Sequence, residues 1–485
     1  MSDESDPVAD ELRADAWCGE PARGTLHEES SLAWGMRRDL PRVTQLLAPI
    51  ATDEADWKQP TVGWGVVLPD RVDVPGTDKA LGVDAPKAIR TLLSARGQAP
   101  VLRYDAALQP GTLRRYDAKG KPSEPSFSGE RGMGANAIPR YLLIVGSPTE
   151  IPWSVQYRMQ NDAFVGRLDL EPDGLERYVE SLIRGWDGAT LDPCRPVVWA
   201  VDRGFPDITH LMRRGIADRL HDGFAEDPDG EFDMGSGFIS DGNASHASLR
   251  TALAQRKPAF VFTSSHGATF PLNDHVAMRD QLGLPIDLDG TVLDVDTLTR
   301  DWNPYGAVWY AHACCSAGSD AKSMFEGLVG GESSLGRTLS SIANVGACSA
   351  PLPRHLLGGQ TPLRAFIGHV EPTFNWTLQS PTTGEVTTHH VVNALYNQLH
   401  GTKRPPVGLA MRVYFQAVAG LLQDYWAAID DVDKHLARAR QAARRAKLVA
   451  YDRLAMVLLG DPTVSLPRSG PVSQRSHKIG GHALT

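Results

Sequence analysis

Two apolar segments, AFVFTSSHG (259–267) and AVWYAHACC (307–315), decide the fold class of this chain. Each is a short run of β-branched and aromatic residues that ends in small or polar residues, a pattern typical of a strand buried on both faces of a parallel sheet. Apolar residues three and four positions apart predict amphipathic helices between such runs, at 175–186 and 208–224. The alternation of strand and helix predicts an α/β fold with mostly parallel sheets.

The same patterns predict further elements and a division of the chain. Candidate strands are 140–146, 195–202, 343–350 and part of 63–74, and candidate helices are 325–343 and about 408–457. A stretch from about 105 to 137 is rich in Gly, Pro, Ser and Lys and is interpreted as a linker. The expected parts are a disordered acidic tail (1–30), an N-terminal region with the linker (31–137), a first α/β subdomain (138–240), a second α/β subdomain (241–467) and a disordered tail (468–485).

Composition and charge exclude several classes of protein. The chain has 485 residues, and 49 Lys and Arg against 58 Asp and Glu give a net charge of −9, which argues against nucleic acid as the main partner. The basic run 434–447 is therefore interpreted as a solvated helix face. No secretory signal is visible at the N-terminus, and no apolar run approaches the roughly 20 residues that a membrane span needs. Five cysteines without a CxxC pair predict a reduced, cytoplasmic chain that has no thiolate zinc site.

The residues that could carry chemistry lie at the carboxyl ends of the two apolar segments. His266 is near the end of the first, and Cys314 is near the end of the second, 48 residues later. If the two strands are parallel, as a βαβ crossover requires, their carboxyl ends meet at one edge of the sheet, where α/β folds place their ligands. A Cys and a neutral His within reach form a thiolate–imidazolium pair, which is a strong nucleophile. Alternatively, Cys314 is a small buried apolar residue and His266 is a hydrogen-bonded polar residue at a strand end.

These blocks resemble a known family. An apolar block ending in His-Gly, followed some 50 residues later by one ending in Ala-Cys, is similar to the caspase-like cysteine peptidases. Within that group, RYLLIVGSPTEIPW with DAFVGRLDLE, and LLGDPTVSLP (458–467), resemble segments of the gingipain-type peptidases. The resemblance covers roughly 138–467. It implies a caspase/gingipain-like α/β/α sandwich of two α/β subdomains preceded by the N-terminal region.

The resemblance also implies an activity. The chain would be a cysteine endopeptidase that acts on a protein or peptide substrate through an acyl-enzyme, with no cofactor and no metal. Gingipains are secreted, but no signal peptide is visible here, so we expect an intracellular peptidase that is restrained by narrow specificity, by activation or by a regulatory protein partner. Cys314, which follows Ala313 as the family pattern requires, would be the nucleophile, and Cys315 would pack beneath it. His266 would be the general acid and base, and the N–H groups of Gly267 and Cys314 would hold the oxyanion.

Two acidic residues receive roles from the resemblance. Glu150 occupies the turn from which gingipain-type enzymes orient the imidazole, although an ordinary surface Glu is an equal interpretation. Asp162 lies where Arg-specific relatives place an acid at the base of the P1 pocket, which would favour cleavage after Arg or Lys.

Other classes of function remain open. A catalytically inactive caspase-like scaffold or binding module is the first alternative, since the N-terminal region could serve as an interaction domain. A metal-dependent hydrolase built on His266, His275, His312 and Cys314 is the second, although the chain has no HExxH motif. The acidic loop 271–298 could form one wall of the cleft or bind calcium, but its aspartates, Asp287, Asp289, Asp294 and Asp296, lack the order of an EF-hand.

Overall fold

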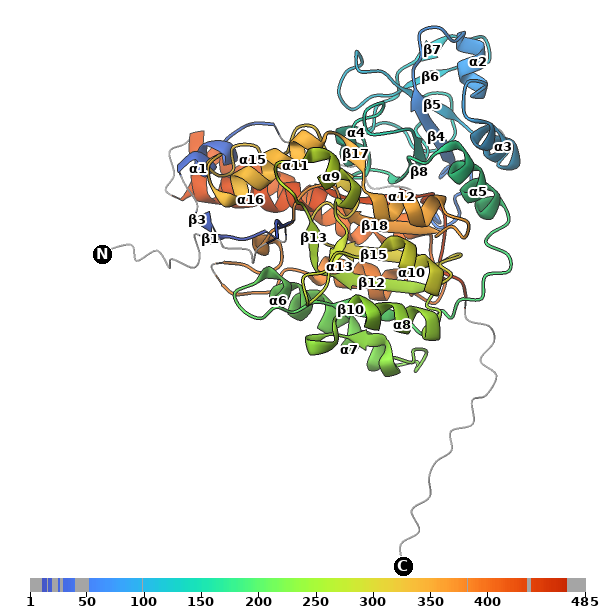
Figure 1. Ribbon diagram of the computed structural model, residues 1–485. Helices are drawn as coiled ribbons and strands as arrows, with labels where there is room; N and C mark the ends of the chain where they lie inside the picture. The colour runs from blue at the N-terminus through green and yellow to red at the C-terminus, as the bar shows by residue number, and fades with distance from the viewer. Residues whose placement is uncertain are drawn as a thin grey trace, which may run out of the picture.

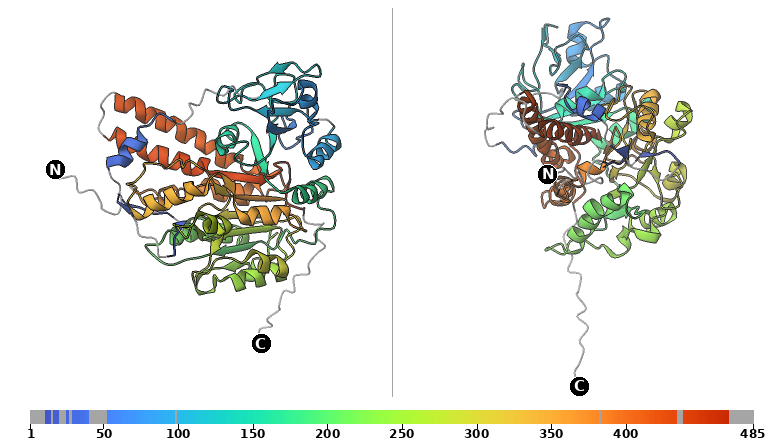
Figure 2. Two further views of the ribbon diagram at one scale, coloured as in Figure 1. Left: turned by 45° about the horizontal axis from the view of Figure 1, so that its top comes forward. Right: turned by 90° about the vertical axis from the view of Figure 1, so that its left-hand side faces the viewer.

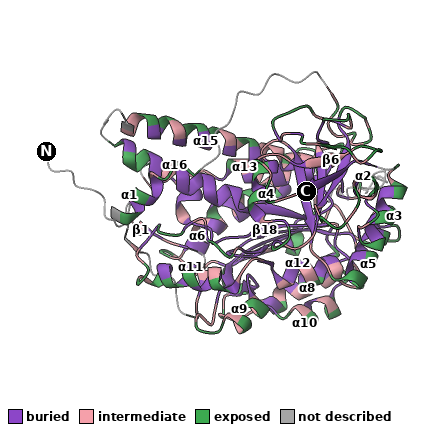
Figure 3. Ribbon diagram, turned by 90° about the horizontal axis from the view of Figure 1, so that it is seen from above, coloured by how far each residue is buried: buried purple, intermediate pink, exposed green. Residues whose placement is uncertain are grey.

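The computed structural model describes residues 11–14, 16–19, 25–26, 29–39, 52–97, 99–381, 383–433 and 438–468. Its centre is a sheet of 12 strands in the order β11-β10-β12-β15-β18-β19-β9-β8-β4-β5-β6-β7. Helices cover both faces of this sheet (Figure 1), so the α/β fold and the mostly parallel sheet expected from the sequence are confirmed. Figure 3 shows that the strands are buried, whereas the helices on the outside carry exposed residues.

Two parallel blocks that run in opposite directions make up most of the sheet. The first block contains β10 (Val197–Ala200), β11 (Phe238–Ile239), β12 (Phe260–Ser264), β15 (Val308–His312) and β18 (Ala365–His369). The second contains β4 (Trp64–Pro69), β5 (Val101–Tyr104), β8 (Tyr141–Val145), β9 (Phe164–Leu168) and β19 (Met456–Gly460). The blocks meet where β18 and β19 pair antiparallel. The carboxyl ends of the two blocks therefore lie at opposite edges of the sheet.

Shorter strands complete the sheets. Two antiparallel strands, β6 (Arg114–Tyr116) and β7 (Pro122–Ser123), extend the second block. A separate three-stranded sheet consists of β2 (Ala16–Trp17), β13 (His266–Ala268) and β14 (Pro285–Ile286). The remaining pairs are β1 (Glu11–Leu12) with β3 (Thr25–Leu26), and β16 (Gly318–Ser319) with β17 (Cys348–Ser349).

The helices form two layers. One layer contains α3 (Lys87–Ala95), α5 (Pro172–Ile183), α8 (His246–Arg256), α9 (His275–Gln281), α10 (Val295–Asp301), α11 (Ser334–Val345) and α12 (Pro351–Gly358). The other contains α4 (Trp153–Met159), α6 (Ile208–Met212), α7 (Asp218–Ala225), α13 (His389–Asn393), α14 (Val407–Ala410), α15 (Arg412–Asp433) and α16 (Ala439–Leu454). Helix α1 (Glu29–Gly35) packs on α16, and α2 (Gly76–Leu81) lies near β6. Single helical turns lie at 213–217, 235–237, 241–243, 375–377 and 394–398. Figure 2 shows the layers from two further directions.

Aromatic contacts show how each layer meets the sheet. Trp309 of β15 contacts Trp302, which follows α10, with ring centroids 5.8 Å apart. Phe260 of β12 lies on the opposite face, since it pairs with Val308, and it contacts Phe224 of α7 at 6.3 Å. Alternating residues of one strand thus fill two cores, which explains why these strands are apolar throughout.

Some expected elements and boundaries differ from the structure. Residues 343–345 end α11, so the strand expected at 343–350 is reduced to Cys348–Ser349, because the helical spacing of the preceding residues continues to Val345. Helix α11 also begins later than expected, at Ser334. The boundary expected at residue 138 falls inside one parallel block, because β4 pairs directly with β8. Short strands β6 and β7 lie within the stretch interpreted as a linker.

Two charged segments are less exposed than their composition suggests. Residues 11–14 and 16–19, expected to belong to a disordered tail, pair with other strands, and Leu12 and Trp17 are buried. In the basic run, Arg444 and Lys447 are buried because they face α1, so a solvated face is wrong for these two side chains. Within the two expected tails, residues 1–10, 15, 20–24, 27–28 and 469–485 lie outside the described residues, as do residues 434–437 of the basic run.

Candidate active site

The strands that precede His266 and Cys314 are neighbours in the sheet. β12 and β15 pair in parallel, and their last partners are Ser264 and His312. His266 lies two positions after Ser264, and Cys314 lies two positions after His312. The register of the two strands therefore brings His266 and Cys314 to the same edge of the sheet. The parallel strand ends expected from the sequence are therefore present.

Backbone packing joins the two segments directly. A Cβ atom placed on Gly267 would lie 2.0 Å from the carbonyl oxygen of Cys314 and 3.1 Å from its nitrogen. Only a residue without a side chain permits this approach. The backbone N–H of Thr373, in the loop after β18, donates a hydrogen bond to Cys314 Sγ at 3.3 Å. Three loops of the first block thus converge on Cys314.

Asp207 is the acid that contacts the imidazole. Its Oδ2 lies 2.9 Å from Nε2 of His266, which is completely buried. Burial alone would raise the pKa of Asp207, but the hydrogen bond and the charge of His266, together with bonds from Thr209, hold this pKa at about 2. Asp207 is therefore ionised at neutral pH and can only accept, so Nε2 carries the proton. The other ring nitrogen, Nδ1, then has the lone pair that can take the proton of a thiol.

Sequence reasoning missed Asp207. It precedes α6, and its side chain accepts hydrogen bonds from the backbone N–H and the hydroxyl of Thr209. An Asp with a Thr two residues later is a signal for the start of a helix, and it says nothing of catalysis. The contact with His266 spans 59 residues and depends on the pairing of β10 with β12, which places the loop after β10 beside the end of β12.

The structure does not place Glu150 at the imidazole, which corrects the prediction for this residue. Glu150 follows β8, in the block that runs opposite to β12, so it lies beyond the other edge of the sheet. Its carboxylate accepts hydrogen bonds from the N–H and hydroxyl of Ser147 and lies 3.8 Å from Arg71. The reversal of direction between β18 and β19 is the physical reason that an acid after β8 cannot serve a histidine after β12.

Asp162 lies at the same edge as Cys314 but several strands away. It precedes β9, and β18 and β19 stand between β9 and β15, a separation of about 14 Å at the usual strand spacing. Burial raises the pKa of Asp162, against the charges of Arg131 and Arg140. Two arginines of the chain thus already provide positive charge beside this carboxylate.

Cys315 has a strained backbone next to the candidate nucleophile. Its φ of 56° lies in the left-handed region, which is unfavourable for a residue with a side chain. Its N–H donates to the carbonyl of Glu371, whose own side chain accepts hydrogen bonds from Ser323 and from the Met324 N–H. Burial raises the pKa of Glu371 to about 8, although these bonds lower it. The backbone therefore turns directly after Cys314 and bonds to the end of β18 and the loop after it.

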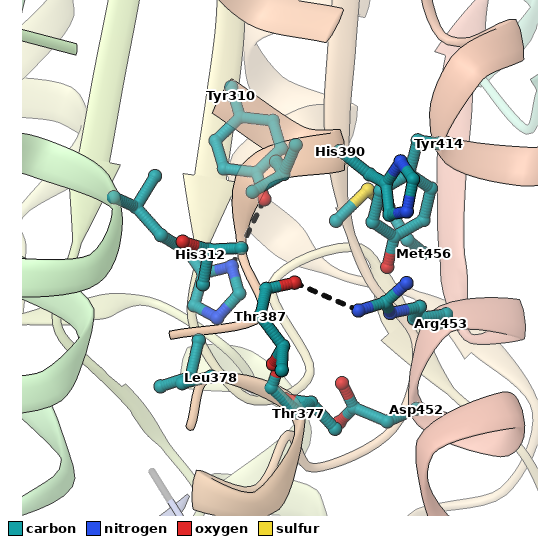
Figure 4. A pocket seen from close by; sticks show the side chains of 13 residues that line it. Tyr310, His312, Thr377, Leu378, Thr387, His390, Tyr414, Asp452, Arg453 and Met456 are labelled. Atoms are coloured by element: carbon teal, nitrogen blue, oxygen red, sulfur yellow. Dashed lines mark hydrogen bonds between the residues drawn. The ribbon is translucent and has the colours of Figure 1, made fainter. Parts of the chain in front are cut away.

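A small pocket lies on the face of β15 that carries His312, two residues before Cys314. Figure 4 shows Tyr310 and His312 on one side of the pocket and Asp452 with Arg453 on the other. The hydroxyl of Tyr310 lies 3.0 Å from Nδ1 of His312, and burial lowers the pKa of His312 to about 3. His312 is therefore a buried neutral imidazole.

The residues considered for metal binding do not form a cluster. Among the described residues, no group of three or more His, Cys, Asp or Glu side chains is arranged to hold a metal ion. Asp287 accepts hydrogen bonds from backbone N–H groups of its own loop, and Asp294 caps α10 in the same way. His275 begins α9.

Within the described parts of the chain, no helix is both long and apolar enough to cross a membrane.

Comparisons with known proteins give no assignment. No family model matches the sequence, no curated protein matches it, and no solved structure matches the fold.

Proposed function

We propose that this chain is a cysteine endopeptidase of the caspase-like kind, with Cys314 as the nucleophile and His266 as the general base and acid. The observation that carries the proposal is the parallel register of β12 and β15, which sets the two residues at one edge of the sheet. The close backbone approach of Gly267 to Cys314 supports it, because the segment that follows His266 lies directly against the candidate nucleophile. The carboxylate of Asp207 behind His266 completes a Cys-His-Asp arrangement.

The reaction would proceed in two steps. His266 Nδ1 takes the thiol proton of Cys314, and the sulfur attacks the scissile carbonyl carbon. The N–H groups of Gly267 and Cys314 stabilise the oxyanion, and the imidazolium then gives its proton to the leaving amine as the peptide C–N bond breaks. Water attacks the thioester with His266 as the base, and the acid product and the free thiol are released. Asp207 holds the imidazole in the tautomer that this sequence requires.

Cleavage of a fluorogenic peptide library varied at P1 tests the proposal. Because residues 11–14 and 16–19 lie against the site, the test uses chains from which this segment has been cut away. We expect activity in the cut chain and in its Cys315→Ala variant, and none in its Cys314→Ala variant. Cys315→Ala is the matched control because it removes the same buried group at the next position. Equal activity of the cut chain and of its Cys314→Ala variant would overturn the proposal. Insensitivity to chelators together with sensitivity to alkylation would separate this mechanism from that of a metal-dependent hydrolase.

A preference for Arg or Lys at P1 belongs to the same proposal. Asp162 would supply the negative charge, and the library reads the preference directly. If Asp162→Asn leaves an Arg or Lys preference unchanged, the specificity originates at another residue. Arg131 and Arg140 favour that result, because their positive charges already act on the Asp162 carboxylate.

An inactive scaffold is the second candidate function. The observation that favours it is burial, because the side chains of both His266 and Cys314 have an exposed fraction of 0%. A substrate cannot reach them in this conformation.

A further inference from the structure

The N-terminal strap, residues 11–14 and 16–19, lies against the candidate active site. Its strand β2 pairs in parallel with β13, so that Ala16 lies opposite Gly267 and Trp17 opposite Ala268. The carbonyl of Trp17 accepts hydrogen bonds from the N–H of Thr269 at 3.1 Å and from its hydroxyl at 3.2 Å. The strap therefore adds a strand to the segment that contains the candidate general base (Figure 1).

Trp17 covers the imidazole. The centroid of its ring lies 5.4 Å from that of His266, and the guanidinium carbon of Arg203 lies 4.5 Å from the Trp17 centroid. Ala16 packs against the apolar cluster that contains Cys314, Met278 and Leu282. The strap thus contacts His266 and packs against the cluster that contains Cys314.

The strap is also bound to the two other loops around the site. The guanidinium of Arg13 donates a hydrogen bond to the carbonyl of Pro206 at 2.8 Å, next to Asp207. Its backbone N–H donates to Oδ1 of Asn375 at 3.0 Å, and its carbonyl accepts from the N–H of Asn375. Ala14 forms a bridge with Phe374, directly after Thr373, whose N–H contacts Cys314 Sγ. The strap consequently bonds to the loops after β10, β12 and β18, three of the four that carry the site.

We infer that the strap occupies the groove in which an extended substrate peptide binds, and that it holds the enzyme in a latent state. The inference rests on the proposed function. An exposed strand edge binds extended peptides through main-chain hydrogen bonds. The edge of β13 that faces Ala16 is such an edge, it lies beside Gly267, and the chain's own segment fills it. A substrate reaches Cys314 only after the strap leaves.

Cutting the chain beside the strap tests this inference. A specific protease site replaces residues 20–24, and the cut chain is diluted so that the fragment containing the strap dissociates. The control carries the same site in place of residues 434–437, between α15 and α16. One readout is the alkylation rate of Cys314 by iodoacetamide, from peptide mapping with Cys348 as the internal reference. The other is cleavage of the peptide library.

We expect the cut at 20–24, and not the cut at 434–437, to raise the alkylation rate of Cys314 at least tenfold and to start peptide cleavage. A synthetic peptide of residues 11–19 should then reverse both effects, and the same peptide with Trp17 replaced by Ala should be at least tenfold weaker. In the uncut chain, Trp17→Ala should also raise the alkylation rate of Cys314.

The outcomes separate the two proposals. Faster alkylation that the peptide reverses, without any peptide cleavage, supports the strap and overturns the peptidase. Unchanged alkylation after the strap fragment has left overturns the strap inference, whether or not the chain cleaves peptides. Full cleavage activity in the uncut chain also overturns it.

Discussion

The contact between Asp207 and His266 makes Asp207 the residue whose replacement has the clearest consequence. In Asp207→Asn the amide can donate to Nε2, which favours the wrong tautomer of His266. We therefore expect peptide cleavage by the opened enzyme, which is the chain cut at 20–24 and freed of its strap, to fall by a factor of about 10² to 10⁴. The pKa of about 2 means that ionisation of Asp207 adds about 2 kcal/mol to the stability of the wild type at pH 7 relative to low pH, and the Asn variant lacks this pH-dependent gain. That contribution is present above the ordinary Asp pKa and is lost as the pH falls through 2.

Two measurements check this prediction for Asp207. Activity of the opened enzyme gives the catalytic effect, and urea unfolding at pH 7 and at pH 3 gives the change in stability. Glu150→Gln is the control, because Glu150 lies beyond the opposite edge of the sheet, where its carboxylate bonds to Ser147 and lies near Arg71. An Asp207→Asn enzyme as active as wild type would contradict the role of this carboxylate, as would a Glu150→Gln enzyme with the larger loss.

Gly267 supports a second prediction at the scale of the residue. A methyl group at this position would lie 2.0 Å from the carbonyl oxygen of Cys314, so the backbone of one segment must move. We expect Gly267→Ala to reduce cleavage by the opened enzyme more than 100-fold, because a shift of about 1 Å costs that much where reacting groups must be aligned. Gly331→Ala is the control, since no atom lies within 4 Å of its added methyl group. Equal activity of the two variants would contradict the prediction.

At the scale of the element, Lys447 fastens α1 to α16. Its ammonium group donates to the carbonyls of Trp34 and Arg37 and lies 2.6 Å from Asp39. Lys447→Met leaves these acceptors without their donor, so we expect a loss of about 2 to 3 kcal/mol in the free energy of unfolding. Urea unfolding of this variant and of Arg440→Met, an exposed position on the same helix, makes the comparison. A loss of equal size in both variants would contradict a specific role for Lys447.

Element by element, the sequence predicted strands best where they are apolar on both faces. β8, β10, β12 and β15 lie within their expected segments, because each packs between two helix layers. The sequence did not predict β18, because its apolar run, residues 365–367, is followed directly by a glycine and a histidine. β19 lay in the segment matched to the family and was not recognised as a strand, since it directly follows α16 and continues its apolar pattern.

The site shows the same division between local and distant causes. His266 and Cys314 could be paired from the sequence because each ends a recognisable strand, and parallel strands end together. Asp207 could not, because the order of β10 and β12 in the sheet, which the sequence does not display, brings it to the imidazole. Glu150 was misplaced for the corresponding reason, since only the pairing of β18 with β19 reverses the direction of its block.

At the scale of the whole molecule, buried titratable groups determine how stability varies with pH. Burial lowers the pKa of His312 and His400 to about 3, so unfolding takes up protons below the ordinary His pKa of about 6.5, and stability there rises with pH. Glu371 has the opposite effect. Its raised pKa of about 8 contributes stability that is present below the ordinary Glu pKa and is lost as the pH rises through 8.

Between pH 6.5 and 8.5 the histidines no longer contribute, and Glu371 dominates. We expect the free energy of unfolding to fall by about 2 kcal/mol across this window, at 1.36 kcal/mol for each pH unit over which the folded chain retains a proton that the unfolded chain has lost. Glu371→Gln can still accept the Ser323 hydroxyl and should remove most of the decline, whereas Glu326→Gln, at an exposed position, should leave it. Urea unfolding at pH 6.5, 7.5 and 8.5 measures it. A decline of equal size in Glu371→Gln would show that another group titrates, and since Asp452 has a pKa of about 7, Asp452→Asn would then identify it.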